Sequence, residues 1–179
     1  MLLDALRNEP TIIPHLCADC TENGIGVGID PTIVADKLLI IKVDDYYHAN
    51  VHPQPKSPDC LIVQQCEENT YSIYIAELRD IDSPDGFSIK EIVEKFETCL
   101  GNFMSERFGI LFHDTNYQYR SIKLLFVTDP YGYKRQPEKQ NKDRGLKLDN
   151  LLSVRIPKYF GKHLYIEPML PNPTIKSCS

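Results

Sequence analysis

A single α/β domain with a mixed central sheet and one crossover helix is predicted by three observations on the sequence. Apolar, β-branched runs of strand length recur at 37–43, 60–65, 71–79 and 121–128. Between the last two runs, residues 87–107 repeat apolar side chains at helical spacing. The chain of 179 residues is 42% hydrophobic and 25% charged, without an internal repeat or a linker, as expected for one globular domain.

The segments before the first strand are less regular. Residues 1–6 are predicted to be helical, because leucines recur on one face, and Pro10 interrupts the pattern. Residues 23–28 alternate glycine with apolar side chains. A nucleotide-binding loop would need a preceding strand and a following helix, and Pro31 follows almost at once. We therefore interpret 23–28 as a flexible turn.

The first three strands are predicted to be antiparallel neighbours. Two aspartates end the strand at 37–43, and residues 46–57, rich in Tyr, His and Pro, predict a loop. The polar residues 67–70 then form the turn between the strands at 60–65 and 71–79. The second and third strands should therefore pair as a hairpin.

The helix at 87–107 has a clear start signal. Ser88 followed by Glu91 is a capping box. Glu91 with Lys95 is an i, i+4 pair on a stripe of mixed charge, which we interpret as a solvated face.

The strand at 121–128 is a continuous apolar run, which predicts a central position covered on both faces. Short late strands are predicted at 151–156 and 163–166, followed by a proline-rich tail that ends at residue 179. The predicted organisation is thus a core at 37–128, a loop at 129–150 and late strands with a tail at 151–179.

The overall charge and the lack of a long apolar run limit the possible partners of the chain. A formal net charge of −5 gives no general attraction to nucleic acid, so such binding would need a local patch. No run reaches membrane-spanning length and the first residues do not form a signal peptide, so we expect no membrane association and a cytoplasmic location.

The six cysteines are expected to be reduced thiols, because nothing marks the chain for export. His15, Cys17 and Cys20 have the spacing of half a zinc site. Two interpretations stay open: a zinc site completed through the fold, or thiols buried near the end of the first helix.

The loop that follows the strand at 121–128 reverses the charge of the chain. Between Lys134 and Lys147 it has only two acids, Glu138 and Asp143, and its basic and amide side chains suit contacts with phosphate and with base edges. A mobile, solvated loop is an equally good interpretation. The basic residues are Lys134, Arg135, Lys139, Lys142, Arg144 and Lys147.

Two acids lie where the hairpin would bring them together. Asp59 begins the second strand and Glu77 lies near the end of the third. In an antiparallel pair these ends are adjacent, and two adjacent carboxylates repel each other unless a cation lies between them. Strand alternation puts Glu77 on the face of Ile73 and Ile75, where a buried acid needs a partner. The alternative is that Asp59 caps the turn after Pro58 and Glu77 faces solvent.

The order of elements across 37–128, with Pro58-Asp59 and Glu77-x-Arg79, resembles the PD-(D/E)XK nuclease superfamily, which includes many restriction endonucleases. The resemblance implies a restriction-endonuclease-like core in which Asp59 and Glu77 bind Mg²⁺ or Mn²⁺. It also implies a lysine two residues after the second acid, where this chain has Arg79 instead.

The arginine leaves three alternatives open, because a guanidinium stays charged and cannot act as a base. Arg79 stabilises the phosphate while the metal alone activates water, Lys90 supplies the amine from the following helix, or the site binds without catalysing.

The resulting hypothesis is a restriction-type, metal-dependent endonuclease that hydrolyses DNA phosphodiester bonds. A chain this short has little room for recognition elements, so we expect a homodimer, or a subunit that cuts one strand and relies on a larger recognition partner. Two alternatives remain: an RNA nuclease of the same superfamily, and a non-catalytic interaction or regulatory protein that retains the fold.

Overall fold

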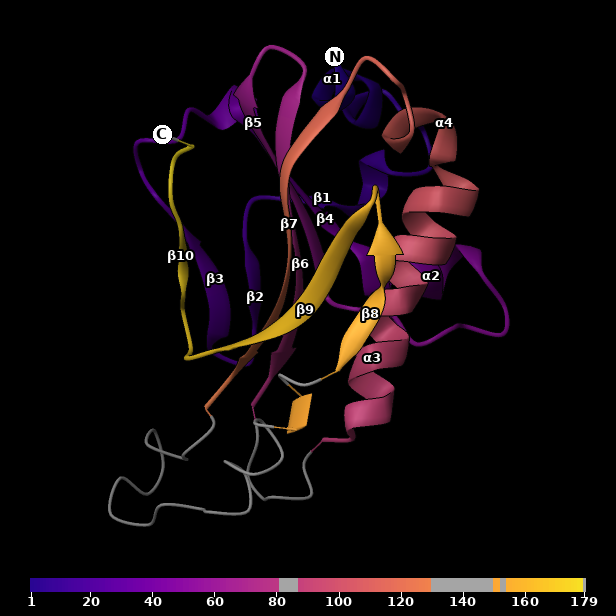
Figure 1. Ribbon diagram of the computed structural model, residues 1–179, viewed down its shortest axis with the longest axis vertical. Coiled ribbons are helices and arrows are strands. Elements are labelled where there is room, and N and C mark those ends of the chain that lie inside the picture. The colour runs from indigo at the N-terminus through magenta and orange to yellow at the C-terminus, as the bar shows by residue number, and fades with distance from the viewer. Residues whose placement is uncertain (81–86, 130–149, 152–153, 179) are drawn as a thin grey trace.

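The structure, a computed structural model, describes residues 1–80, 87–129, 150–151 and 154–178. Its centre is a seven-stranded mixed sheet in the order β1-β4-β5-β6-β7-β9-β8 (Figure 1). The strands of this sheet are β1 Leu16–Cys17, β4 Leu38–Lys42, β5 Cys60–Glu67, β6 Thr70–Arg79, β7 Gln118–Thr128, β8 Arg155–Tyr159 and β9 Lys162–Met169.

A second, three-stranded sheet has the order β10-β3-β2. It consists of β2 Cys20–Glu22, β3 Ile25–Ile29 and β10 Thr174–Ile175. The helices are α1 Leu2–Arg7, α2 Val43–Asn50, α3 Ile89–Glu97 and α4 Gly109–Phe112, with short 3-10 turns at η1 Ile13–His15 and η2 Ala35–Lys37 and a π-helical segment at η3 Thr98–Arg107.

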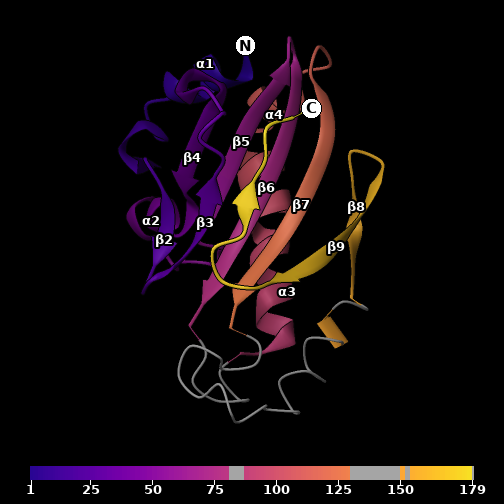
Figure 2. The ribbon, with the colours of Figure 1, turned by 90° about the vertical axis from the view of Figure 1, so that its left-hand side faces the viewer.

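The molecule has three layers. One face of the large sheet packs on the helices through a core that includes Ile73, Ile75 and Phe96. The other face packs on the small sheet through a second core, to which Ile62 and Leu125 belong. Figure 2 shows β3 and β10 in front of the large sheet and α3 behind it. The alternation of side chains along β5 and β6 therefore fills two separate cores.

The predicted order of the central elements is confirmed. β4, β5 and β6 are antiparallel neighbours, α3 and η3 follow, and β7 returns parallel to β6. β7 is central, as expected, since its second neighbour β9 is also parallel to it. The chain is thus a mixed α/β protein with a mixed sheet.

The long helix begins as predicted. The Ser88 hydroxyl accepts a hydrogen bond from the Glu91 main-chain N–H at 3.5 Å. In a complete capping box the Glu91 side chain would also accept a hydrogen bond from the Ser88 main-chain N–H. Here the Glu91 carboxylate binds Arg79 on the sheet instead.

Two predictions before the hairpin are wrong. Residues 46–57 do not all form a loop, because α2 continues directly from β4 and buries Val43, Tyr46 and Tyr47 at helical spacing. Residues 23–28 do not form a flexible turn. Only Asn23 and Gly24 turn, with positive φ angles of 48° and 77°, and β3 follows.

Gly26 in β3 is required by the close approach of β2. A Cβ at this position would lie 2.6 Å from Thr21 Cγ2 and 2.8 Å from the Cys20 main-chain oxygen. The alternating glycines therefore belong to a strand pairing with little room between its backbones.

The late elements differ partly from expectation. β9 contains the predicted strand at 163–166, whereas β8 begins only at Arg155 rather than at residue 151. The proline-rich segment also holds β10, which pairs in parallel with β3.

The expectation of six reduced cysteines is wrong for four of them. Cys20 on β2 forms a disulfide with Cys60 on β5, and Cys66 near the end of β5 forms one with Cys178. Cys17 and Cys99 are free. The spacing of cysteines did not reveal these pairs, which are 40 and 112 residues apart in the chain.

We expect alkylation of the denatured, unreduced protein to modify Cys17 and Cys99 only. After reduction, all six cysteines should react. Mass spectrometry of the alkylated chain measures both numbers. Six labels without a reductant would contradict the cross-linked structure.

Among the residues that the structure describes, no helix has the length and apolar character needed to cross a membrane.

Candidate active site

The two acids singled out by the sequence lie together at one edge of the large sheet. Cys60 pairs with Ala76 in the antiparallel β5–β6 ladder, so Asp59 and Glu77 lie opposite each other one position further on. Both line a pocket of about 400 Å³ at this edge. The prediction that the hairpin brings Asp59 and Glu77 together is confirmed.

Asp59 is nearly buried, with 6% of its surface exposed. Its Oδ2 accepts a hydrogen bond of 2.6 Å from the main-chain N–H of Leu78. Burial, and next the negative charge of Glu77, raise the pKa of Asp59 to about 8. Asp59 therefore carries a proton at neutral pH, although a nearby cation would readily displace it.

Glu77 is more deeply buried, at 1% exposure, and it has two cationic partners. Lys95 Nζ donates to both carboxylate oxygens, at 2.8 and 2.9 Å, and Arg79 Nε donates to Oε1 at 2.8 Å. Burial still raises the pKa of Glu77, while Lys95 and then Arg79 act in the opposite direction. The interpretation of Glu77 as a solvent-facing strand end is therefore wrong.

Arg79 connects the sheet to the long helix. Besides Glu77, it binds the Glu91 carboxylate through Nη2 at 2.9 Å. A guanidinium presents several donors in a fixed plane and can bind two carboxylates at once, whereas a lysine offers a single ammonium. Through this double contact, Arg79 links β6 to α3.

The amine of the site comes from Lys95 and not from Lys90. Lys95 lies one helical turn after Glu91 on α3, and its side chain is only 15% exposed. Lys90 is exposed and does not line the pocket. The lysine at the pocket is therefore Lys95 of α3, and the alternative that assigned this position to Lys90 names a residue outside the pocket lining.

The spacing of Glu91 and Lys95 in the sequence is a signal for the role of Lys95. Glu91 and Lys95 have the spacing of a solvated i, i+4 pair, but in the fold each binds a residue of β6. Both side chains face the sheet edge, so the predicted solvated face is wrong for these two residues.

Lys56, in the segment before Asp59, forms ion pairs with two glutamates of α3. Its Nζ lies 3.8 Å from Glu91 Oε2 and 3.6 Å from Glu94 Oε2. These contacts are long and half-exposed, so each contributes little alone. Together they keep the approach to Asp59 against α3.

Two further carboxylates reach the pocket from outside the hairpin. Glu22 comes from the end of β2, and Asp44 from the first turn of α2. Asp44 Oδ1 is buried and has no hydrogen-bond partner among the described residues, and burial raises the pKa of this carboxyl. Neither acid could be connected with the hairpin from the sequence, because both reach the pocket only through the tertiary fold.

The residues present fit a divalent cation in their chemistry. Mg²⁺ and Mn²⁺ prefer carboxylate oxygens and need only one or two of them when water and a phosphate complete the coordination. Asp59 and Glu77 would hold the cation, once it replaces the Asp59 proton and part of the Lys95 contact. Within the described residues, no group of three or more His, Cys, Asp or Glu is placed to hold a metal ion.

Two further predictions of binding residues concern other parts of the chain. The zinc interpretation of His15, Cys17 and Cys20 is not supported, because the Cys20 sulfur is bonded to Cys60. The basic residues predicted to contact nucleic acid all lie in 130–149, outside the described residues; they are Lys134, Arg135, Lys139, Lys142, Arg144 and Lys147.

Fold and site define a mixed α/β protein with two buried acids in a pocket at one sheet edge. Lysine and arginine bind one of them, Glu77. The chain matches no protein-family model, and no curated protein or solved structure matches it.

Proposed function

We propose that the protein is a metal-dependent endonuclease that hydrolyses DNA phosphodiester bonds. One observation carries the proposal: Asp59 and Glu77 end adjacent antiparallel strands in one pocket, with the Lys95 ammonium bound to Glu77. Carboxylates of this kind beside a lysine are what the restriction-endonuclease-like fold requires. The order of three antiparallel strands, a helix and a parallel strand supports the same family.

The chemistry of the chain's own residues follows from their contacts. Lys95, held by Glu77, donates hydrogen bonds at the pocket and can orient a water or a phosphate oxygen. Arg79 remains charged and a third exposed, which suits it to stabilise negative charge on a phosphate. A bound divalent cation would supply the remaining chemistry, by lowering the pKa of a water and neutralising the phosphate.

DNA is the proposed substrate, with RNA as the alternative. Recognition is assigned to a second copy of the chain or to a larger subunit, because the core leaves little additional surface for base contacts. A cytoplasmic location stays a prediction. The two disulfides weigh against it, since such bonds persist mainly in oxidising compartments.

Glu77→Ala should abolish plasmid nicking in Mn²⁺, with a loss of at least about 100-fold, because a carboxylate ligand is removed. The assay uses the full chain, alone and with candidate partner subunits. A control variant, Glu97→Ala, removes an exposed acid at the end of α3 and should leave nicking unchanged. Nicking that survives Glu77→Ala would refute the proposed site.

A non-catalytic interaction protein is the second candidate, and the completeness of the ion pairs favours it. Glu77 already has Lys95 and Arg79 as partners and needs no metal for neutrality. In that case Mn²⁺ should not raise the melting temperature, whereas a metal-binding native state must be stabilised by it.

A further inference from the structure

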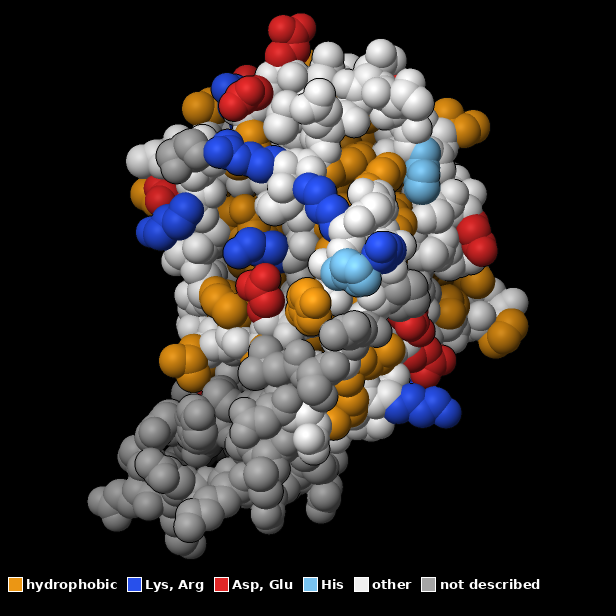
Figure 3. Space-filling model, viewed as in Figure 1, with side chains coloured by type: hydrophobic (Ala, Val, Ile, Leu, Met, Phe, Trp, Pro, Cys, Tyr) orange, Lys and Arg blue, Asp and Glu red, His pale blue; other side chains and the backbone are white. Residues whose placement is uncertain are grey.

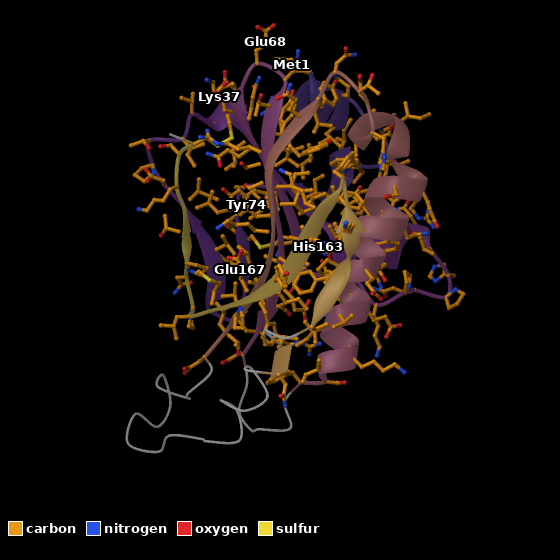
Figure 4. All side chains as sticks on the ribbon, in the orientation of Figure 1. Met1, Lys37, Glu68, Tyr74, His163 and Glu167 are labelled. Atoms are coloured by element: carbon orange, nitrogen blue, oxygen red, sulfur yellow. A yellow bond between two sulfur atoms is a disulfide. The ribbon has the colours of Figure 1, made fainter. Side chains whose placement is uncertain are left out.

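A second pocket lies on the opposite face of the large sheet from Glu77. It has a volume of about 340 Å³, within the range of small-molecule sites, and lies between β7, β9 and the segment 173–178. Figure 4 shows Tyr74 and Glu167, which both line it, between β7 and β10. The pocket of Asp59 and Glu77 is called the metal pocket below, and none of its acids named above lines this second pocket.

A β-bulge concentrates polar side chains at this pocket. Tyr71 pairs with Tyr119, but Ser72 pairs with Ser121, so Arg120 is an extra residue in β7. Because the bulge interrupts the alternation, Arg120 and Ser121 both reach the face that Lys123 occupies. A regular strand would have directed two adjacent residues to opposite faces.

The rim of the pocket is basic although the protein is acidic overall. Arg120, Lys123 and Lys176 line it, and Glu167 is the single acid among the described residues of its lining. The two lysines have ion pairs, Lys123 with Glu167 at 3.7 Å and Lys176 with Asp30 at 3.6 Å. Both ion pairs are long and both lysines are exposed. A phosphate can therefore replace the carboxylate partner of each lysine at little cost in free energy. Figure 3 shows Lys and Arg side chains around a hollow on this face.

The floor of the pocket is apolar. Val27, Leu125 and Ile175, each 4% exposed, close it from below, and the Tyr74 ring flanks it. Tyr74 is fixed by a 3.3 Å hydrogen bond from its hydroxyl to Gln64 Oε1. A ligand that combines an apolar part with an anionic group would match both the floor and the rim.

The segment that closes the pocket is firmly held. Pro173 and Ile175 main-chain oxygens accept hydrogen bonds from Gly28 and Asp30 on and after β3, at 2.8 and 2.9 Å. The Cys66–Cys178 disulfide fixes its end. The cavity is thus preformed, which lowers the entropic cost of binding.

We propose that this pocket binds a nucleoside phosphate, with the base on the apolar floor beside Tyr74 and the phosphate on Arg120, Lys123 and Lys176. The ligand is a free nucleotide or one nucleotide of a single strand, since both present the same groups. Its position across the sheet makes the site independent of the metal pocket and of the proposed nuclease activity.

Calorimetric titration of the full chain with adenosine monophosphate, in a chelating buffer, tests this proposal. We expect the nucleotide to bind at least about tenfold more tightly than adenosine or inorganic phosphate, since each lacks one half of the contacts. Lys123→Ala and Arg120→Ala should each weaken binding about tenfold, as loss of a charged hydrogen bond does. Lys158→Ala should have no effect, because Lys158 is an exposed residue of β8 that does not line the pocket.

Two further binding measurements complete the test. A single-stranded oligonucleotide that binds more tightly than the mononucleotide identifies a nucleic-acid strand as the source, and the reverse order identifies a free nucleotide. Glu77→Gln should not change either affinity. Absence of binding at millimolar nucleotide, or binding that Lys123→Ala and Arg120→Ala leave unchanged, would overturn the assignment.

Discussion

Lys95→Met is expected to reduce metal-dependent cleavage by at least about 100-fold, the usual range for loss of a positioned proton donor. The substitution removes the ammonium that binds both oxygens of Glu77. Lys90→Met, on the same helix but exposed, should change the rate less than about twofold. Nicking kinetics of the two variants decide between the lysines.

In this experiment, cleavage lost because the variant unfolds must be distinguished from cleavage lost because the ammonium is missing. Glu77 is buried, and removing one partner of a buried ion pair costs about 3–5 kcal/mol unless another partner remains, as Arg79 does here. The double variant Lys95→Met, Glu77→Gln removes both charges together and should melt near the wild type. If Lys95→Met folds and still cleaves at the wild-type rate, the lysine has no role in the reaction.

The second large effect is a steep pH dependence of metal affinity. Because the pKa of Asp59 is raised to about 8, a divalent cation must displace one proton at lower pH. Mn²⁺ affinity should therefore rise about tenfold per pH unit below about pH 8 and level off above it. Titration calorimetry between about pH 6 and 9 measures this slope, and a flat profile would contradict the protonated state.

The stability of the metal-free protein gives the control, with the opposite dependence. An unfolded aspartate titrates near 3.9, so between about pH 4 and 8 the folded chain holds a proton that the unfolded chain has lost. The free energy of unfolding should fall as pH rises through this window. Asp59→Asn, which is neutral throughout, should lack this contribution and melt several degrees higher than the wild type at about pH 9.

The hairpin and its acids could be predicted because the relevant signals are local. Runs of β-branched residues, a polar turn and the period of two together fix where Asp59 and Glu77 meet. Lys95 could not be assigned in the same way, since a lysine at i+4 from Glu91 has the same spacing whether it faces water or a buried acid. Only the packing of α3 on the sheet distinguishes these cases.

Contacts between the two sheets could not be predicted from the sequence for a related reason. Cys20 and Cys60 carry no pairing information in their spacing, and Gly26 has a role only once β2 lies against β3. The helix α2 was missed because Tyr, His and Pro favour a loop, while the burial of Tyr46 and Tyr47 depends on tertiary packing.

The positions of the two disulfides also determine the shape of the chain when it is unfolded but not reduced. The bond from Cys20 to Cys60 and the bond from Cys66 to Cys178 close two separate rings, joined by residues 61–65 of β5. Each closure removes conformational freedom worth roughly 4–5 kcal/mol in a chain-entropy estimate. The unfolded polymer is then two rings joined by a short linker from β5. Asp59 and Glu77 lie in different rings, both within about twenty residues of this linker.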